Sequence, residues 1–196
     1  MTTPKDIPGI RNITVSGRIG SGATTLAHGL AEYFGWEMLD GGKIMRKIQA
    51  ELGAGVEQTS KRPDSFDLEY EEKIKSMLQN ESHHIIQSHL AGFDAQGVEG
   101  VFKFFVVCED RDGSDKVDVR IDRLVNRDGI SIEQAKHEVR ERDRQNLEKW
   151  RRLYAHDDPN WFYWDTKYYD AVINTYSHNH EGSLQLALEA LHKRNI

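Results

Sequence analysis

Short continuous runs of apolar residues alternate along the chain with stretches whose apolar residues have helical spacing. Five runs have the length and composition of buried strands, at residues 11–16, 36–39, 83–87, 101–107 and 169–174. The other stretches predict helices near residues 24–34, 43–52, 65–80, 115–128, 131–154 and 183–193. Strands that alternate with helices favour an α/β fold, in which a five-stranded parallel sheet is flanked by helices on both faces.

Turn and capping signals mark the ends of these helices. Gly129 is placed to end the helix before it, and Asp40 is placed to cap the helix after it. Ser131 and Gln134 have the spacing of a capping box. The helix that they open, within about 128–156, is highly charged and has too few apolar residues to be buried on all sides. We therefore expect it to form a mobile helical lid.

Composition and charge narrow the class of protein. The 196 residues are 38% hydrophobic and 30% charged, which fits a single domain spanning residues 1–196. The formal net charge of −6 excludes a basic field that would bind nucleic acid or an anionic membrane. The N-terminus lacks the apolar core of a signal peptide, and no apolar run reaches membrane-spanning length, so we expect a cytoplasmic protein. The single cysteine, Cys108, lies in an apolar run, which favours a buried thiol over a nucleophile.

One glycine-rich stretch separates the first predicted strand from the first predicted helix. Its sequence is Gly17-Arg18-Ile19-Gly20-Ser21-Gly22-Ala23-Thr24-Thr25. A strand, a glycine loop and a helix in this order indicate a phosphate-binding loop rather than an ordinary turn. Glycines let the backbone approach a ligand closely, and N–H groups at the positive end of a helix bind phosphate oxygens. Thr24 has the position that holds Mg²⁺, but Ala23 stands where the pattern requires lysine.

Arginines and one histidine are the other candidates for phosphate chemistry. Arginine suits phosphoryl transfer because its planar guanidinium binds phosphate oxygens with two nitrogens and stays charged. Arg46 follows the glycine turn after the second strand, at the edge where a parallel sheet binds ligands, and His89 lies at the same edge. His83 and His84 are adjacent and would face opposite ways in a strand, so they predict no metal site.

An aromatic loop follows the predicted lid, at Trp161, Phe162, Tyr163 and Trp164. Such rings either stack on a nucleobase or pack between a lid and the core. The packing interpretation is favoured here.

Four further segments carry a resemblance to a known family. Residues 39–46 have the sequence L-D-G-G-K-I-M-R, residues 85–92 have I-I-Q-S-H-L-A-G, and residues 119–129 have V-R-I-D-R-L-V-N-R-D-G. The fourth segment spans 142–154 and is followed by Y-D-A-V-I-N-T at 169–175. Together with the glycine loop, their order and spacing resemble the cytidylate kinase family of nucleoside monophosphate kinases, particularly its archaeal form.

The resemblance implies a three-layer P-loop kinase fold with an acceptor-binding region at about 40–82. It also implies transfer of the ATP γ-phosphate to CMP or dCMP with Mg²⁺, by a protein that we expect to be a monomer with nucleotides as its partners. Carried over, Gly17 to Thr25 would hold the ATP phosphates, with Thr24 at the metal. Asp40, Gly41 and Arg46 would bind the acceptor. The residues expected to act in catalysis are His89, Arg123, Arg127 and Arg142.

Several positions depart from the family pattern. Ala23 replaces lysine, Gly41 replaces a hydroxyl residue, and Gln87-Ser88-His89 replaces Glu-Gly-Arg. Lys149 replaces a lid arginine, which keeps the charge but loses the planar guanidinium. A lost charged contact in a water-excluded site costs about 10²–10³ in rate.

These departures leave three functions open. The first is an active cytidylate-type kinase in which His89 and lid arginines compensate for the lost charges. The second is a regulatory nucleotide-binding protein with little or no turnover, and the third is a kinase for another small acceptor. The first and third predict ADP release that depends on the right acceptor, whereas the second predicts binding without product.

Overall fold

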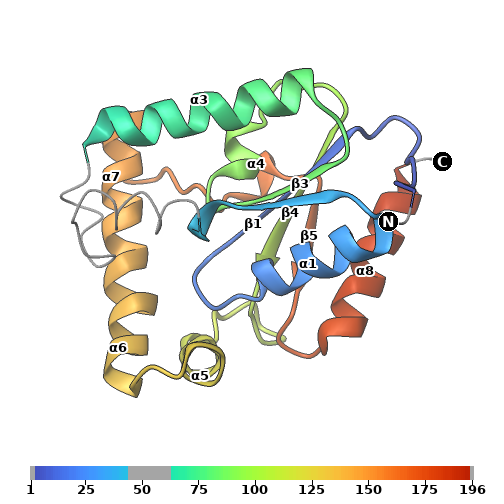
Figure 1. Ribbon diagram of the computed structural model, residues 1–196. Coiled ribbons are helices and arrows are strands. Elements are labelled where there is room, and N and C mark those ends of the chain that lie inside the picture. The colour runs from blue at the N-terminus through green and yellow to red at the C-terminus, as the bar shows by residue number, and fades with distance from the viewer. Residues whose placement is uncertain (1–2, 44–62, 195–196) are drawn as a thin grey trace.

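The computed structural model describes residues 3–43 and 63–194, which form a three-layer α/β fold around one sheet (Figure 1). The strands have the order β2-β3-β1-β4-β5, and every neighbouring pair is parallel. Their bounds are β1 (Asn12–Gly17), β2 (Glu37–Asp40), β3 (His84–Gln87), β4 (Val101–Val107) and β5 (Ala171–Asn174). All six residues of β1 are buried, as expected for the central strand of a parallel sheet covered on both faces.

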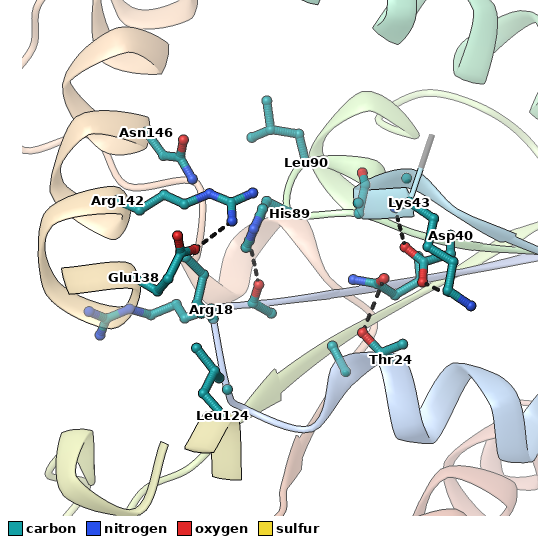
Figure 2. Close-up of a pocket in the computed structure, with 18 of the residues that line it drawn as sticks. Arg18, Thr24, Asp40, Lys43, His89, Leu90, Leu124, Glu138, Arg142 and Asn146 are labelled. Atoms are coloured by element: carbon teal, nitrogen blue, oxygen red, sulfur yellow. Dashed lines mark hydrogen bonds and ion pairs between the residues drawn. The ribbon is translucent and has the colours of Figure 1, made fainter. Parts of the chain in front are cut away.

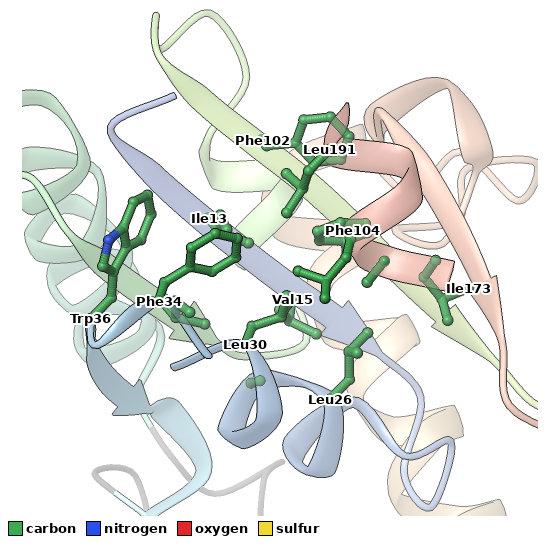
Figure 3. Packing of buried hydrophobic residues seen from close by; sticks show 14 of the residues in the cluster. Ile13, Val15, Leu26, Leu30, Phe34, Trp36, Phe102, Phe104, Ile173 and Leu191 are labelled. Carbon is green, nitrogen blue, oxygen red and sulfur yellow. The ribbon is translucent and has the colours of Figure 1, made fainter. Parts of the chain in front are cut away.

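Helices cover both faces of this sheet. One face packs on α1 (Ala23–Phe34) and α8 (His180–Lys193), and the other on α3 (Asp64–Asn80) and α4 (Ala91–Asp94). Beneath α1 and α8, side chains of the central strands and of α1 interlock in the main core, where Ile13, Val15, Leu30 and Phe104 are fully buried (Figure 3). A second, smaller apolar cluster lies beneath α3 and α4. The two cores fix the strands so that their carboxyl ends meet at one edge.

A long helical segment faces this edge. After α5 (Val117–Asp128), the chain forms α6 (Ile132–His137), a π-helical segment η2 (Glu138–Arg142) and α7 (Asp143–Ala155). Val139 packs against α5 in one apolar cluster, and Trp150 packs in another with aromatic residues from the loop before β5. The segment is the predicted lid. It is anchored at both ends on apolar clusters, and its mobility stays a prediction.

The predicted elements are confirmed, with differences at a few ends that have local causes. The helix predicted from residue 115 begins at Val117, because Asp115 forms an isolated bridge with Glu109. The last helix begins three residues before its predicted start, because the Asn179 side chain caps it by accepting from the Gly182 N–H. The predicted capping box is confirmed, and so is the helix end at Gly129.

One predicted helix, at 43–52, lies outside the described residues except for Lys43. Its predicted cap is present, because the Lys43 N–H donates to the Asp40 Oδ1 over 2.9 Å.

Candidate functional site

The loop between β1 and α1 follows a path that requires glycine. Gly20 has a φ of +78°, and a Cβ there would come 2.5 Å from the Arg120 carbonyl oxygen. A Cβ at Gly17 would come 2.5 Å from the Ser21 Oγ. Gly22, with a φ of +100°, precedes the first turn of α1, and no side chain caps that turn. The first N–H groups of α1 therefore point out of the helix without a side-chain acceptor, as a phosphate site requires.

A cavity of about 970 Å³ lies along this loop. Its other walls come from the ends of β2 and β3, from α3 and α4, and from the lid (Figure 2). Ser21 is buried in the loop itself and is the predicted loop residue that does not line the cavity. The loop residues that line it are Gly17, Arg18, Ile19, Gly20, Gly22, Ala23, Thr24 and Thr25. The fold thus brings the predicted phosphate loop, acceptor region and lid around one space.

Oxygen ligands suited to Mg²⁺ lie beside the loop. The Thr24 hydroxyl donates to the Gln87 Oε1 over 3.3 Å, and the Asp40 carboxylate lines the same cavity (Figure 2). Among residues 3–43 and 63–194, no group of three or more His, Cys, Asp or Glu side chains could hold a metal alone. In phosphoryl-transfer sites Mg²⁺ keeps several waters and binds substrate phosphates with only one or two protein ligands, so this donor set fits it.

His89 contacts the phosphate loop from the end of β3. Its Nδ1 lies 2.8 Å from the Gly17 carbonyl oxygen, which can only accept, so Nδ1 carries the proton and Nε2 is the acceptor atom of the neutral ring. Burial lowers the pKa of His89 below 6.5, and the charge of Arg142 lowers it further. His89 is therefore a neutral brace for the loop at pH 7 and adds no positive charge to it.

Arg142 brings a cation from the lid into the cavity. Its Nη1 donates to the Glu138 Oε2 over 2.7 Å, and its side chain is 20% exposed. The Nε is buried and has no hydrogen-bond partner among the described residues. Figure 2 shows its guanidinium beside His89. Arg142 is thus placed to neutralise charge on a ligand in the cavity.

Arg127 and the acceptor-side residues Asp40 and Gly41 also line the cavity. Both guanidinium nitrogens of Arg127 that face Asp128 donate to its carboxylate, over 2.7 and 2.6 Å. Arg46 lies outside the described residues.

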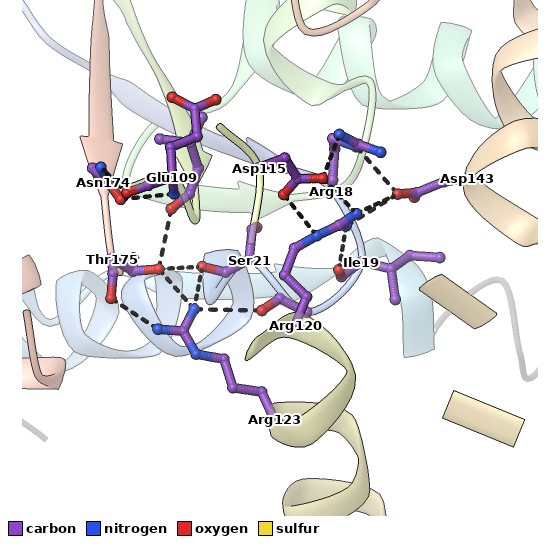
Figure 4. A network of polar contacts seen from close by, with 12 residues as sticks. Arg18, Ile19, Ser21, Glu109, Asp115, Arg120, Arg123, Asp143, Asn174 and Thr175 are labelled. Carbon is purple, nitrogen blue, oxygen red and sulfur yellow. Dashed lines mark hydrogen bonds and ion pairs between the residues drawn. The ribbon is translucent and has the colours of Figure 1, made fainter. Parts of the chain in front are cut away.

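Arg123 does not line the cavity. From α5 it donates to the Thr175 Oγ1 and to the Thr175 carbonyl oxygen, each over 2.8 Å (Figure 4). It also reaches the carbonyl oxygens of Gly20 and Ser21, at 3.5 and 3.3 Å. The family resemblance implies that Arg123 faces the phosphates or the ATP base, whereas the structure has it supporting the loop backbone from outside.

Two arginines and two aspartates form a network behind the loop, in which Arg120 and Asp143 are buried (Figure 4). The Asp143 Oδ2 lies 3.1 Å from the Arg18 Nε and 3.0 Å from the Arg120 Nη1, and Asp115 contacts both arginines. Arg120, whose side chain is 1% exposed, also donates to the Ile19 carbonyl oxygen over 2.6 Å. The charges balance within the network, which ties the loop to α5 and to the start of α7.

The wall opposite the loop carries polar residues to which the sequence patterns did not point, namely Asp67, Tyr70, Glu71 and Asp94. A signal existed for three of them, because Tyr70 and Glu71 follow Asp67 at the spacing of one helix face. Asp94 gave none beyond being a carboxylate after an apolar stretch. A Cβ at Gly41 would meet the Tyr70 hydroxyl, so the small residue at position 41 makes room for this phenol.

Two contacts join this wall to the lid. Lys149 is buried with its Nζ 2.5 Å from the Asp67 Oδ2, and the Tyr154 hydroxyl donates to the Glu71 Oε2. The charge expected at position 149 on the lid is therefore directed to α3 rather than to the loop.

The remaining sequence candidates lie away from the cavity. His83 pairs with Asp6, and His84 pairs with Glu81. Cys108 is buried, as predicted, and burial raises the pKa of its thiol, which disfavours a nucleophilic thiolate.

The aromatic loop has a structural role. Trp161 and Tyr163 are buried against Trp150 of the lid, so the predicted packing is confirmed. Within the described part of the chain, no helix is both long and apolar enough to cross a membrane.

Solved structures show which class of fold this is. A gluconokinase from Sinorhizobium meliloti superposes with a TM-score of 0.55 at 15% identity, covering 97% of this chain and 95% of its own. A shikimate kinase from Acinetobacter baumannii, in complex with shikimate, superposes with a TM-score of 0.51 at 16% identity, covering 95% and 93%. The fold is that of the P-loop kinases.

Sequence relatives define the family more narrowly. No protein-family profile matches the chain. The cytidylate kinase of Methanopyrus kandleri is 31% identical over 175 residues, covering 83% of each chain. That of Haloarcula marismortui is 30% identical over 182 residues, covering 91% of this chain and 88% of its own. The chain belongs to the cytidylate kinase family, as its motifs predicted.

Proposed function

We propose that the chain is a nucleoside monophosphate kinase that transfers the γ-phosphate of ATP to CMP or dCMP. One observation carries the proposal: the phosphate loop, the acceptor-side residues Asp40 and Gly41, and the lid line the same cavity. Two nucleotides held there would meet end to end and away from water. Membership of the cytidylate kinase family supports a cytosine nucleotide as the acceptor.

The donor nucleotide binds along the glycine loop. Its phosphates accept hydrogen bonds from loop N–H groups and lie at the positive end of α1. Mg²⁺, when bound, neutralises phosphate oxygens, and Thr24 and Gln87 are the residues that would hold it. His89 and Arg123 keep the loop in shape through its carbonyl groups.

Charge neutralisation at the transferred group falls to the lid. Phosphoryl transfer needs positioning and electrostatic stabilisation rather than covalent help from the protein. Ala23 offers no charge, so we assign this role to Arg142, with Arg127 at the same cavity. On the acceptor side, Asp40 and Gly41 line the space, and the assignment of Arg46 to the acceptor phosphate rests on the sequence alone.

A coupled ADP-release assay tests the proposal. Mg-ATP is offered with each nucleoside and deoxynucleoside monophosphate in turn, and CMP and dCMP are expected to give acceptor-dependent ADP. The same nucleotides are tested for their effect on the melting temperature. If CMP raises the melting temperature but no monophosphate gives ADP, the chain is a nucleotide-binding protein without turnover and the proposal fails.

A further inference from the structure

The acceptor wall, formed by Tyr70, Glu71 and Asp94, has a chemistry that phosphate transfer does not require. Tyr70 and Glu71 belong to α3 and Asp94 ends α4, and all three line the cavity. These side chains offer carboxyl and phenol groups rather than cations. Such a wall disfavours a phosphate group and suits the uncharged end of a nucleotide.

Two polar atoms of the acceptor wall are buried without a partner. The Asp94 Oδ2 and the Tyr70 hydroxyl have no hydrogen-bond partner among the described residues. Buried polar groups are nearly always hydrogen-bonded, because an unpaired one is costly. Both atoms belong to side chains that line the cavity, so a ligand there can complete their bonding.

The two carboxyl groups of the acceptor wall, Asp94 and Glu71, have different surroundings. Burial and the negative charge of Glu71 raise the pKa of Asp94 well above its ordinary value, and Lys75 opposes this only in part. Glu71 accepts a hydrogen bond from the Tyr154 hydroxyl, which stabilises its charged form. The raised pKa favours a protonated Asp94, which both donates and accepts, beside a Glu71 carboxylate that only accepts.

Cytosine matches this combination. It presents a ring nitrogen that accepts and, beside it, an amino group that donates two hydrogen bonds. A carboxylic acid donates its O–H to the ring nitrogen and accepts from the amino group, which leaves the second amino N–H for a carboxylate. Uracil has a carbonyl oxygen in place of the amino group, and a carboxylate would repel it.

We propose that Asp94, together with Tyr70 and Glu71, binds the cytosine base of the acceptor nucleotide and selects it against uracil. This assignment rests on the proposed function and goes beyond it by naming the residues that choose the base. The acceptor phosphate then points away from the acceptor wall, toward the glycine loop and Arg142.

Variants at position 94 separate hydrogen bonding from charge. Asparagine keeps one donor and one acceptor in the shape of the protonated carboxyl, whereas leucine keeps neither. Asp94→Leu is expected to raise the Kd and KM for CMP about ten- to a hundredfold, with the KM for ATP unchanged. Asp94→Asn should stay within about threefold of the parent chain. Tyr70→Phe, which removes one hydroxyl, should weaken CMP binding less than Asp94→Leu does.

The measurements are calorimetric Kd values for CMP and UMP and steady-state kinetics with both acceptors. Glu99→Gln, an exposed change outside the cavity, is the matched control. Preference for CMP that survives in Asp94→Leu overturns the assignment and leaves the proposed function intact. Equal losses of CMP affinity in Asp94→Asn and Asp94→Leu contradict the inference that Asp94 binds the base as a protonated carboxyl group. A parent chain that neither binds nor phosphorylates CMP overturns the proposed function as well.

Discussion

Ala23 lies at the first residue of α1, buried beside the phosphates' expected place, and has no charge to offer them. If the loop lacks only its lysine, Ala23→Lys should raise kcat/KM for ATP at least about tenfold, because a charged contact in a water-excluded site contributes about 10²–10³ in rate. Ala23→Met, similar in length but neutral, is the control. Steady-state kinetics with CMP as the acceptor check the result.

The same kinetics test whether Arg142 already supplies the positive charge that Ala23 lacks. Arg142→Ala should lower kcat about 10²-fold, and the loss should be smaller when the chain also carries Ala23→Lys. Arg144→Ala changes an exposed arginine two residues further along the lid, in α7, and should leave kcat unchanged. Equal losses from Arg142→Ala with and without the introduced lysine would show that the two positions act independently.

Asp94 also gives a prediction about pH. Its pKa is raised above 3.8 in the folded chain, so above pH 4 the unfolded chain releases this proton while the folded chain keeps it. Stability is therefore lost as the pH rises toward the folded-state pKa. Asp94→Asn does not titrate, so its melting temperature should exceed that of the parent chain at pH 7.5, and the gap should narrow at pH 4.5. A gap that does not change with pH contradicts the raised pKa.

For individual site residues, the sequence predicts the positions that follow a motif and misses those that tertiary contacts determine. Thr24 and His89 were predicted at the cavity because glycine spacing and strand ends place them there. The position of Arg123 depends on Thr175, which is far away in the sequence and reaches the loop only through β5. Tyr70 faces the cavity through the space left at Gly41, which no local pattern encodes.

Among the secondary-structure elements, α3 and α7 are joined across the cavity by ion pairs. Lys149 and Asp67 form a buried pair, and Arg152 contacts Asp64 near the surface. Asp67→Asn leaves the buried Lys149 with the half-exposed Asp64, 3.7 Å from its Nζ. It should therefore lower the free energy of unfolding by about 3 kcal/mol, the lower end of the range for a broken buried pair. Urea unfolding measures this change.

A double variant and a surface variant serve as controls for the buried pair. Asp67→Asn combined with Lys149→Met should recover most of the lost stability, because no charge is left buried. Arg152→Ala, whose side chain is 54% exposed, should cost no more than about 1 kcal/mol. A double variant as unstable as Asp67→Asn alone would show that packing, rather than charge, holds the two helices together.

Over the whole molecule, the network of Arg18, Arg120, Asp115 and Asp143 connects the phosphate loop, α5 and the lid. Asp143→Asn leaves two arginines short of one carboxylate. It should lower the free energy of unfolding by about 3–5 kcal/mol and raise the KM for ATP, because the loop loses its tie to α7. Asp112→Asn, an exposed change, is the control. Lost stability with an unchanged KM would make the network structural only.

The architecture was predictable because long apolar runs and helical spacing are local properties of the sequence. Residues 101–107 are apolar almost throughout and form the β4 strand with the predicted bounds. The joining of two helices by a π turn was not predictable, because α6 and α7 have the same charged composition as one continuous helix. Their different packing partners are set by the tertiary structure.

The π turn has a consequence for the way the lid is built. Its hydrogen bonds span one residue more than those of an α-turn, so the side chains after it are rotated by about 100° relative to an uninterrupted helix. The helical segment thereby meets two surfaces with its side chains in two different phases: α5 before the turn and the aromatic cluster after it. Arg142 lies at the point where the phase changes. The direction in which Arg142 points is therefore set by the π turn of the backbone as much as by the side chain itself.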